Sequence, residues 1–324
     1  MIPHYVVFVH GIGDERKGFN RGLLKRSQEE FAQTIVRLGS RKPAQGGIDF
    51  REALWSDVTQ PDQNDLWDRL FPQMKGKGMG WMGLLTRPAN WLSRLKYWST
   101  LRRLVVNYQG DLIAYFESQE AHKYTQIHDR VWHAIRDAAE DAKTRGAAAG
   151  NDALLTVVAH SLGAVIVSDL IYDAHHNRNG RSWPQSIRLA NLITFGSPLA
   201  LYNLRYGFGA AAFRAPVRMQ DPYGRWVNLY DPQDVIGYPL KPLNEAYNDA
   251  VFADKEINAG EGWKVWQWPR QVSPLSHRLY WEDPTVAAII GRKAALDWLR
   301  TNQPELEPML KAEYEEYDAW VLRR

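Results

Sequence analysis

The sequence predicts an α/β protein with a mostly parallel central sheet and helices on both of its faces. Short runs rich in β-branched residues alternate with longer segments of helical periodicity, and several of the short runs are apolar throughout, as doubly covered strands should be. The 324 residues, of which 45% are hydrophobic and 24% charged, suffice for an ordinary core. We therefore expect a single domain over residues 1–324.

The expected elements alternate along the chain. The strands are predicted at 4–9, 48–55, 154–159, 189–195, 226–230 and 263–268. The helices are predicted at 18–38, 121–145, 162–176 and 284–301. The stretches 59–108, 199–222 and 239–261 fit neither period, and we expect them to be excursions from the sheet. The C-terminal run contains three apolar or aromatic residues beside glutamates: Tyr314, Tyr317 and Val321. We expect this run to dock on the rest of the domain or on another subunit.

Composition excludes several classes of protein. The chain has no cysteine, which excludes disulfides, thiolate metal sites and a cysteine nucleophile. A strand-like run follows Met1 almost directly, and no apolar run approaches the roughly 18 residues that a membrane span requires. We expect a cytoplasmic protein with no metal and no cofactor, since the adjacent His175 and His176 suit a helix end better than chelation.

The most informative segment surrounds Ser161. An apolar strand runs into Ala159-His160-Ser161-Leu162-Gly163 and then into a helix, with small residues two before and two after the serine. This is the context that a nucleophile elbow requires. The following helix directs free N–H groups and its positive end toward the serine, which favours a developing oxyanion. The alternative is an ordinary strand-to-helix turn in which Ser161 caps the helix.

The first strand ends in a second loop of interest, His10-Gly11-Ile12-Gly13. Its main-chain N–H groups can face an anion, so the N–H groups of Ile12 and Leu162 are expected to form an oxyanion hole. His10, Gly11 and His160 flank the two turns and are expected to line the substrate site. A dinucleotide loop is the alternative, but it requires a third glycine where this chain has Arg16.

A serine nucleophile needs a general base oriented by an acid. Of the nine histidines, only His277 follows the last expected strand, in a loop that should return to the edge where Ser161 is exposed. Asp234 and Asp231 both follow the strand at 226–230. We favour Asp234, because Asp231 precedes a proline and suits a turn. The chain order Ser161, Asp234, His277 has separations of 73 and 43 residues.

With these residues in place, the chain resembles the α/β-hydrolase superfamily over nearly its full length. Three strings are similar to serine lipases and esterases of the group that includes GPI inositol-deacylase-like and DDHD-type enzymes, and the segment 110–116 resembles one in bacterial members. The three strings are Thr194-Phe195-Gly196-Ser197-Pro198-Leu199, residues 228–235, and Ser276-His277-Arg278-Leu279-Tyr280-Trp281.

This resemblance implies an α/β-hydrolase fold and a serine hydrolase that cleaves carboxylic esters through an acyl-enzyme. It implies triad roles for Asp234 and His277, as the residues themselves suggest. Ala159 departs from the glycine usual at the start of the elbow. Two alternatives stay open: an acyltransferase with the same triad, and a catalytically inert lipid-binding scaffold.

The insertion 59–108 is basic, aromatic and locally helical. From Arg69 to Gly110 there are eight basic residues and no acidic one, so the rest of a chain of net charge +3 is acidic overall. We expect the insertion to be a lid over a small-molecule or lipid ester, or a helix packed on the core, with peripheral membrane contact through 69–110. One basic patch is a poor footprint for nucleic acid, which is not expected. The residues expected to contact the acyl group are Met79, Trp81, Met82, Leu85, Trp91 and Trp98.

Overall fold

The computed structural model describes residues 1–11, 17–40, 46–59, 61, 65, 69, 122–203, 216–259 and 276–323. The chain divides into two compact units: residues 1–11, 17–53 and 131–324 form the first, and residues 12–16 and 54–130 form the second. In the second unit, Arg130 donates to the carboxylate of Asp57 at 2.7 Å. All described strands belong to the first unit, whereas the single domain over 1–324 stays a prediction.

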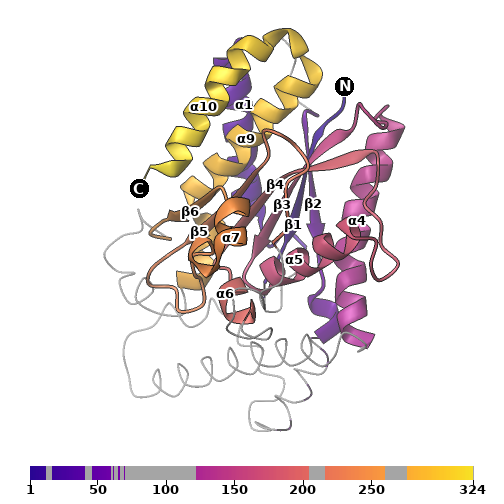
Figure 1. The fold of residues 1–324 in the computed structure, drawn as a ribbon, viewed down its shortest axis with the longest axis vertical. Helices are drawn as coiled ribbons and strands as arrows, with labels where there is room; N and C mark the ends of the chain where they lie inside the picture. The colour runs from indigo at the N-terminus through magenta and orange to yellow at the C-terminus, as the bar shows by residue number, and fades with distance from the viewer. Residues whose placement is uncertain are drawn as a thin grey trace. The chain divides into compact units, whose positions relative to one another are not determined.

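The first unit is built on a six-stranded sheet in the order β2-β1-β3-β4-β5-β6, and every neighbouring pair is parallel (Figure 1). The predicted α/β class with a parallel sheet is thereby confirmed. Because all strands run the same way, their carboxyl ends meet at one edge of the sheet. The strands are β1 (His4–Val9), β2 (Ile48–Ala53), β3 (Ala153–His160), β4 (Ile187–Phe195), β5 (Arg225–Tyr230) and β6 (Ala253–Glu256).

Helices cover both faces of the sheet (Figure 1). On one face, α1 (Arg21–Arg37), α9 (Pro284–Asn302) and α10 (Glu307–Leu322) share a core with side chains of the central strands. The opposite face carries α5 (Leu162–His175) and the second half of α4 (His122–Thr144), where Asp141 accepts a hydrogen bond from the hydroxyl of Tyr5 on β1. Shorter elements complete the unit: α6 (Leu199–Tyr202), η4 (Lys241–Leu243), α7 (Glu245–Ala250), η6 (Ser276–Glu282) and η7 (Pro304–Leu306).

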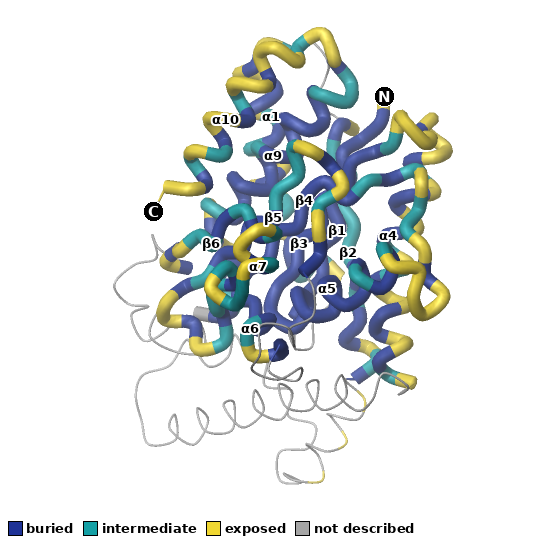
Figure 2. Tube along the Cα trace, viewed as in Figure 1, coloured by how far each residue is buried: buried dark blue, intermediate teal, exposed yellow. Residues whose placement is uncertain are grey.

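How deeply each strand is buried explains how apolar its sequence is. Every residue of β1 and β3 is buried, whereas the edge strands β2 and β6 are largely half-exposed (Figure 2). Inner strands contact helices on both faces, so most of their positions are apolar, and two buried polar exceptions, His4 and Thr156, bond each other. Phe8 of β1 lies wholly inside the core beneath α1 and α9, and burying such a ring contributes about 1.5–3 kcal/mol.

Five expected strands and four expected helices match observed elements within a few residues. The sixth strand is different: β6 lies inside 239–261, where no period was visible, and the predicted strand at 263–268 falls outside the described residues. β6 is a polar edge strand whose Asp254 accepts hydrogen bonds from the N–H groups of Leu240 and Lys241. Charged edge residues carry no apolar alternation, which explains why the pattern missed it.

The C-terminal run docks on the body of the unit. Tyr314, Tyr317 and Val321 of α10 are buried in the core shared with α1 and α9. Of the two docking alternatives that the sequence left open, contact with the same chain is the one observed. The insertion 59–108 lies outside the described residues except at 59, 61, 65 and 69.

The strand order reverses direction beside β1. The chain passes from β1 outward to β2 and then returns to the other side of β1 as β3. In parallel α/β sheets, ligands bind outside the carboxyl ends of the strands at such a reversal. Val9 pairs with Ala159 in the β1–β3 register, and Gly11 lies directly beside Ser161.

Candidate active site

Ser161 lies between the end of β3 and the first residue of α5 with an unusual backbone. Its φ is 54° and its ψ is −129°. Among the non-glycine residues that the structure describes, only Ser161, Asn177 and Asn179 have positive φ, a conformation that costs roughly 1–3 kcal/mol unless asparagine or glycine adopts it. The Ser161 side chain makes no capping hydrogen bond to α5. The alternative of a helix cap is therefore not what the structure shows.

Two glycines allow this turn to approach β1. A Cβ on Gly163 would lie 2.5 Å from the carbonyl oxygen of His10, and a Cβ on Gly11 would lie 2.4 Å from the Cβ of Ser161. Any side chain at either position would push the two loops apart. Ala159, which replaces the usual first glycine, is wholly buried within β3, so its methyl group is accommodated.

His277, on η6, is hydrogen-bonded to Asp234. Its Nδ1 lies 2.8 Å from Oδ2 of Asp234, which sits in the loop after β5. The other carboxylate oxygen of Asp234 accepts from the N–H of Ile236 at 3.0 Å. Burial opposes ionisation of Asp234, but the hydrogen bond and charge of His277 hold the pKa of this carboxyl below its usual value. Asp234 is thus a charged acceptor that orients the imidazole ring.

Asp231 has a different environment from Asp234. Its carboxylate accepts the N–H groups of Gln233 at 2.8 Å and Ala259 at 3.0 Å, so it closes a turn and holds the chain that follows β6. Burial is the main reason that the pKa of Asp231 is raised. Of the two aspartates that the sequence left open, only Asp234 is hydrogen-bonded to His277 within the described residues.

Tyr280 was not singled out as a site residue, yet it links the two aspartates. Its hydroxyl donates to Oδ2 of Asp234 at 3.1 Å and accepts the N–H of Asp231 at 2.7 Å. The ring is fully buried, and burial raises the pKa of its phenol. The only sequence signal for this residue is its place three positions after His277, on the same 3-10 helix.

The side-chain Oγ of Ser161 and the ring Nε2 of His277 have no hydrogen-bond partner among the described residues. Ser161 is 1% exposed and His277 9% exposed, and both Oγ of Ser161 and Nε2 of His277 are buried. The two side chains flank the end of β4: the Ser161 N–H donates to Phe195, and a Cβ on Gly196 would lie 3.0 Å from the His277 ring. Buried polar atoms are rarely left unpaired, so these two have capacity to bind a substrate or each other.

Other predicted site residues have mixed outcomes. Leu162 begins α5, so its N–H is one of those that a helix leaves without an intrahelical acceptor. Gly11 is buried beside Ser161, and the ring of His10 lies edge-on to Phe19 at 5.5 Å. His160 is also buried, with its ring 4.6 Å from that of His277. The remaining predictions lie outside the described residues: Ile12, Met79, Trp81, Met82, Leu85, Trp91 and Trp98.

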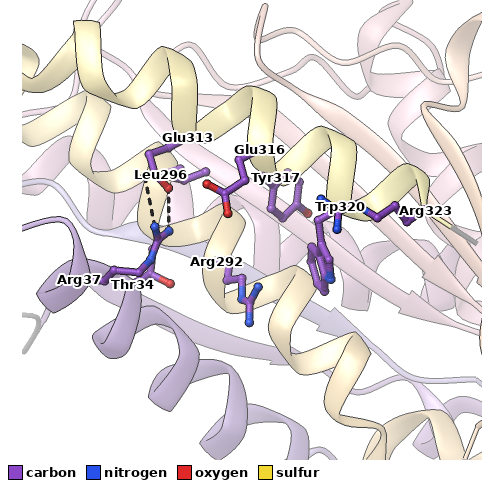
Figure 3. A pocket seen from close by; sticks show the side chains of 9 residues that line it. All are labelled: Thr34, Arg37, Arg292, Leu296, Glu313, Glu316, Tyr317, Trp320 and Arg323. Atoms are coloured by element: carbon purple, nitrogen blue, oxygen red, sulfur yellow. Dashed lines mark hydrogen bonds and ion pairs between the residues drawn. The ribbon is translucent and has the colours of Figure 1, made fainter.

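A separate hollow lies on the outer surface of α1, α9 and α10 (Figure 3). It encloses about 130 Å³ and is crossed by an ion pair between Arg37 of α1 and Glu313 of α10 at 2.7 Å. None of the side chains that line it contacts Ser161, Asp234 or His277 in the part of the chain that the structure describes. This hollow marks where three helices meet and lies apart from the reversal of strand order beside β1.

Two further kinds of feature are absent from the described residues. None of the helices there has an apolar stretch long enough to cross a bilayer. No group of three or more histidine or acidic side chains is arranged there to hold a metal ion.

Comparisons with known proteins add little to this description. No family model matches the chain, and no curated protein matches it. Among solved structures, it is similar to an uncharacterized protein from Pseudomonas aeruginosa, with 11% identity and a TM-score of 0.35. The match covers 99% of this chain and 51% of that one, so the chain spans about half the length of that protein. What is established is therefore the class: an α/β protein with an all-parallel six-stranded sheet and flanking helices.

Proposed function

We propose that the protein is a serine hydrolase of the α/β-hydrolase type that cleaves carboxylic esters. The observation that carries this proposal is that Ser161 lies at the same edge of the parallel sheet as the Asp234–His277 hydrogen bond. Ser161 has a strained backbone, and its side chain does not cap α5. Strain of this kind persists where the surrounding structure enforces it, and it is concentrated at functional sites. The topological reversal beside β1 is also where a ligand would bind.

In the proposed mechanism, His277 Nε2 takes the proton of Ser161 while Oγ attacks the acyl carbon. The resulting oxyanion is held by the N–H groups of Leu162 and Ile12. Collapse of the tetrahedral intermediate breaks the ester C–O bond, and His277 returns the proton to the leaving alcohol. A water molecule, deprotonated by the same imidazole, then cleaves the acyl-enzyme and releases the acid. Asp234 stabilises the imidazolium at both stages and stays ionised.

The proposed substrates are small-molecule or lipid esters, and the reaction needs no cofactor. The insertion 59–108 is proposed as a lid that supplies acyl contacts, with a peripheral membrane surface as a partner. Sedimentation with vesicles tests that contact: a preference for anionic over neutral vesicles supports it, and equal binding removes it.

The decisive test replaces Ser161 by alanine. Ser161→Ala should lower kcat for a p-nitrophenyl ester on the order of 10⁶-fold and abolish labelling by a fluorophosphonate probe. Ser168→Ala is the matched control, because Ser168 is a buried serine on α5, the helix that begins directly after Ser161. Ser168→Ala should keep both ester turnover and labelling by the probe. Turnover that survives in Ser161→Ala would refute the assignment, and an unlabelled wild-type protein would indicate an inert scaffold.

A further inference from the structure

We infer that His160, the residue before the proposed nucleophile, is a positioning residue for the general base. The inference deepens the proposed function and rests on it. Its ring Nε2 lies 2.6 Å from the main-chain carbonyl oxygen of His277, and its Nδ1 lies 3.3 Å from the indole Nε1 of Trp281. The ring of His160 therefore contacts the main chain of His277 and the side chain of Trp281.

The two partners of the ring determine its tautomer. An indole N–H can only donate, so Nδ1 of His160 must be the unprotonated acceptor. A carbonyl oxygen can only accept, so Nε2 must carry the proton. Both bonds form only with a neutral ring, since a proton on Nδ1 would face the N–H of Trp281. Burial, assisted by the charge of His277, holds the pKa of His160 well below its ordinary value and keeps the ring in that form.

Packing holds the ring as tightly as its hydrogen bonds do. His160 is 5% exposed, and its ring lies 5.2 Å from Phe195 and 5.5 Å from Trp281. The His277 ring lies beside it, with a centroid distance of 4.6 Å and a tilt of 37° between the two ring planes. The η6 turn, which carries His277 and Trp281, is thus attached to the end of β3 at two points by one side chain.

This arrangement gives the general base two independent supports. Asp234 holds the imidazole through Nδ1, which orients the ring, while His160 holds the carbonyl, which places the main chain from which the ring projects. Because His160 and Ser161 are adjacent in sequence, the segment that carries the nucleophile also positions the base. A displacement of about 1 Å between reacting groups can cost on the order of 100-fold in rate.

The experiment compares His160→Phe with His160→Gln. Phenylalanine keeps the aromatic packing but removes both hydrogen bonds, whereas glutamine keeps an N–H near the place of Nε2. We expect His160→Phe to lower kcat for a p-nitrophenyl ester roughly 10- to 100-fold with little change in KM, and His160→Gln to recover most of that loss. His175→Phe is the control, since His175 is a half-buried histidine at the far end of α5 packed on Trp183 at 4.8 Å.

A second measurement does not depend on turnover. The downfield NMR resonance of the proton between His277 and Asp234, assigned by its loss in His277→Gln, should broaden or disappear in His160→Phe and persist in His175→Phe. If His160→Phe does not fold, Trp281→Phe removes the donor to Nδ1 and should lower kcat a few-fold and broaden the same resonance.

The outcomes separate this inference from the proposed function. A wild-type protein that neither hydrolyses esters nor labels at Ser161 removes the proposed function and the positioning role together. An active wild type whose kcat and downfield resonance are unchanged in His160→Phe removes only the positioning role. A fall in kcat that His160→Gln does not relieve, with an unchanged resonance, would assign His160 to packing and also overturn the inference.

Discussion

Asp231 and Asp234 are three residues apart in one loop, but their carboxylates have different hydrogen-bond partners. The carboxylate of Asp234 is hydrogen-bonded to the ring of His277, the hydroxyl of Tyr280 and one main-chain N–H. Within the described residues, the carboxylate of Asp231 accepts hydrogen bonds only from main-chain N–H groups. A carboxylate committed to two backbone donors stabilises the loop, whereas one that binds an imidazole can stabilise its charged form.

These roles predict different effects when each aspartate is replaced by asparagine. Asp234→Asn should lower kcat about 10⁴-fold, because the amide no longer selects the correct tautomer of His277. Asp231→Asn should mainly lower the free energy of unfolding by about 1–3 kcal/mol, because one buried N–H loses its acceptor. Steady-state kinetics and urea denaturation of both variants check the prediction. A larger fall in kcat for Asp231→Asn would make Asp231 the triad acid.

At the scale of elements, α9 joins the sheet to α10 through one buried carboxylate. Asp297 accepts from Lys293 one turn earlier on α9, from the amide of Asn191 on β4 and from the hydroxyl of Tyr314 on α10. The side chains of Lys293 and Asp297 are 1% and 0% exposed. A buried ion pair adds little stability as a pair, but removing one partner leaves an uncompensated charge in the core.

Lys293→Met should therefore lower the free energy of unfolding by about 3–5 kcal/mol. The chain provides a matched control in Lys25→Met, because Lys25 pairs with Glu29 at the same spacing on α1 while their side chains are 78% and 53% exposed. The control should change stability by less than about 1 kcal/mol. Urea denaturation measures both. Equal effects in the two variants would show that the buried charge is not the cause.

At the scale of the whole molecule, buried histidines predict how stability depends on pH. His4 is 1% exposed at the start of β1, where Nε2 contacts Thr156, and burial lowers its pKa from 6.5 to about 4. Burial also lowers the pKa of His175 to about 4. Between these values the unfolded chain binds protons that the folded protein does not, so the unfolding free energy falls as the pH drops from 6.5 to 4.

For His4 alone this loss amounts to about 3 kcal/mol by pH 4, and acidification below that value adds nothing further from this residue. Urea denaturation at a series of pH values between 4 and 7 measures the slope, and His4→Gln should flatten it. An identical slope in His4→Gln would mean that this histidine does not contribute to the acid sensitivity.

The fold class was accessible from the sequence because its signals are local. Buried parallel strands are apolar at most positions, and helices repeat their apolar face every three or four residues, so β1, β3 and α5 can be recognised within short windows. The elbow around Ser161 was visible for the same reason, since a tight turn restricts the size of residues at fixed offsets. β6 was missed because a short, charged edge strand lacks such a pattern.

The sequence by itself determined the alternation of strands and helices, the elbow segment and the small set of histidines and aspartates from which a site can be drawn. Only the tertiary structure decided which aspartate bonds His277, that Tyr280 joins the two aspartates, and that the ring of His160 bonds the main-chain carbonyl of His277. These contacts join residues 43 to 117 positions apart. Residue type and local period carry no information about which distant partner the folded sheet brings within hydrogen-bonding reach.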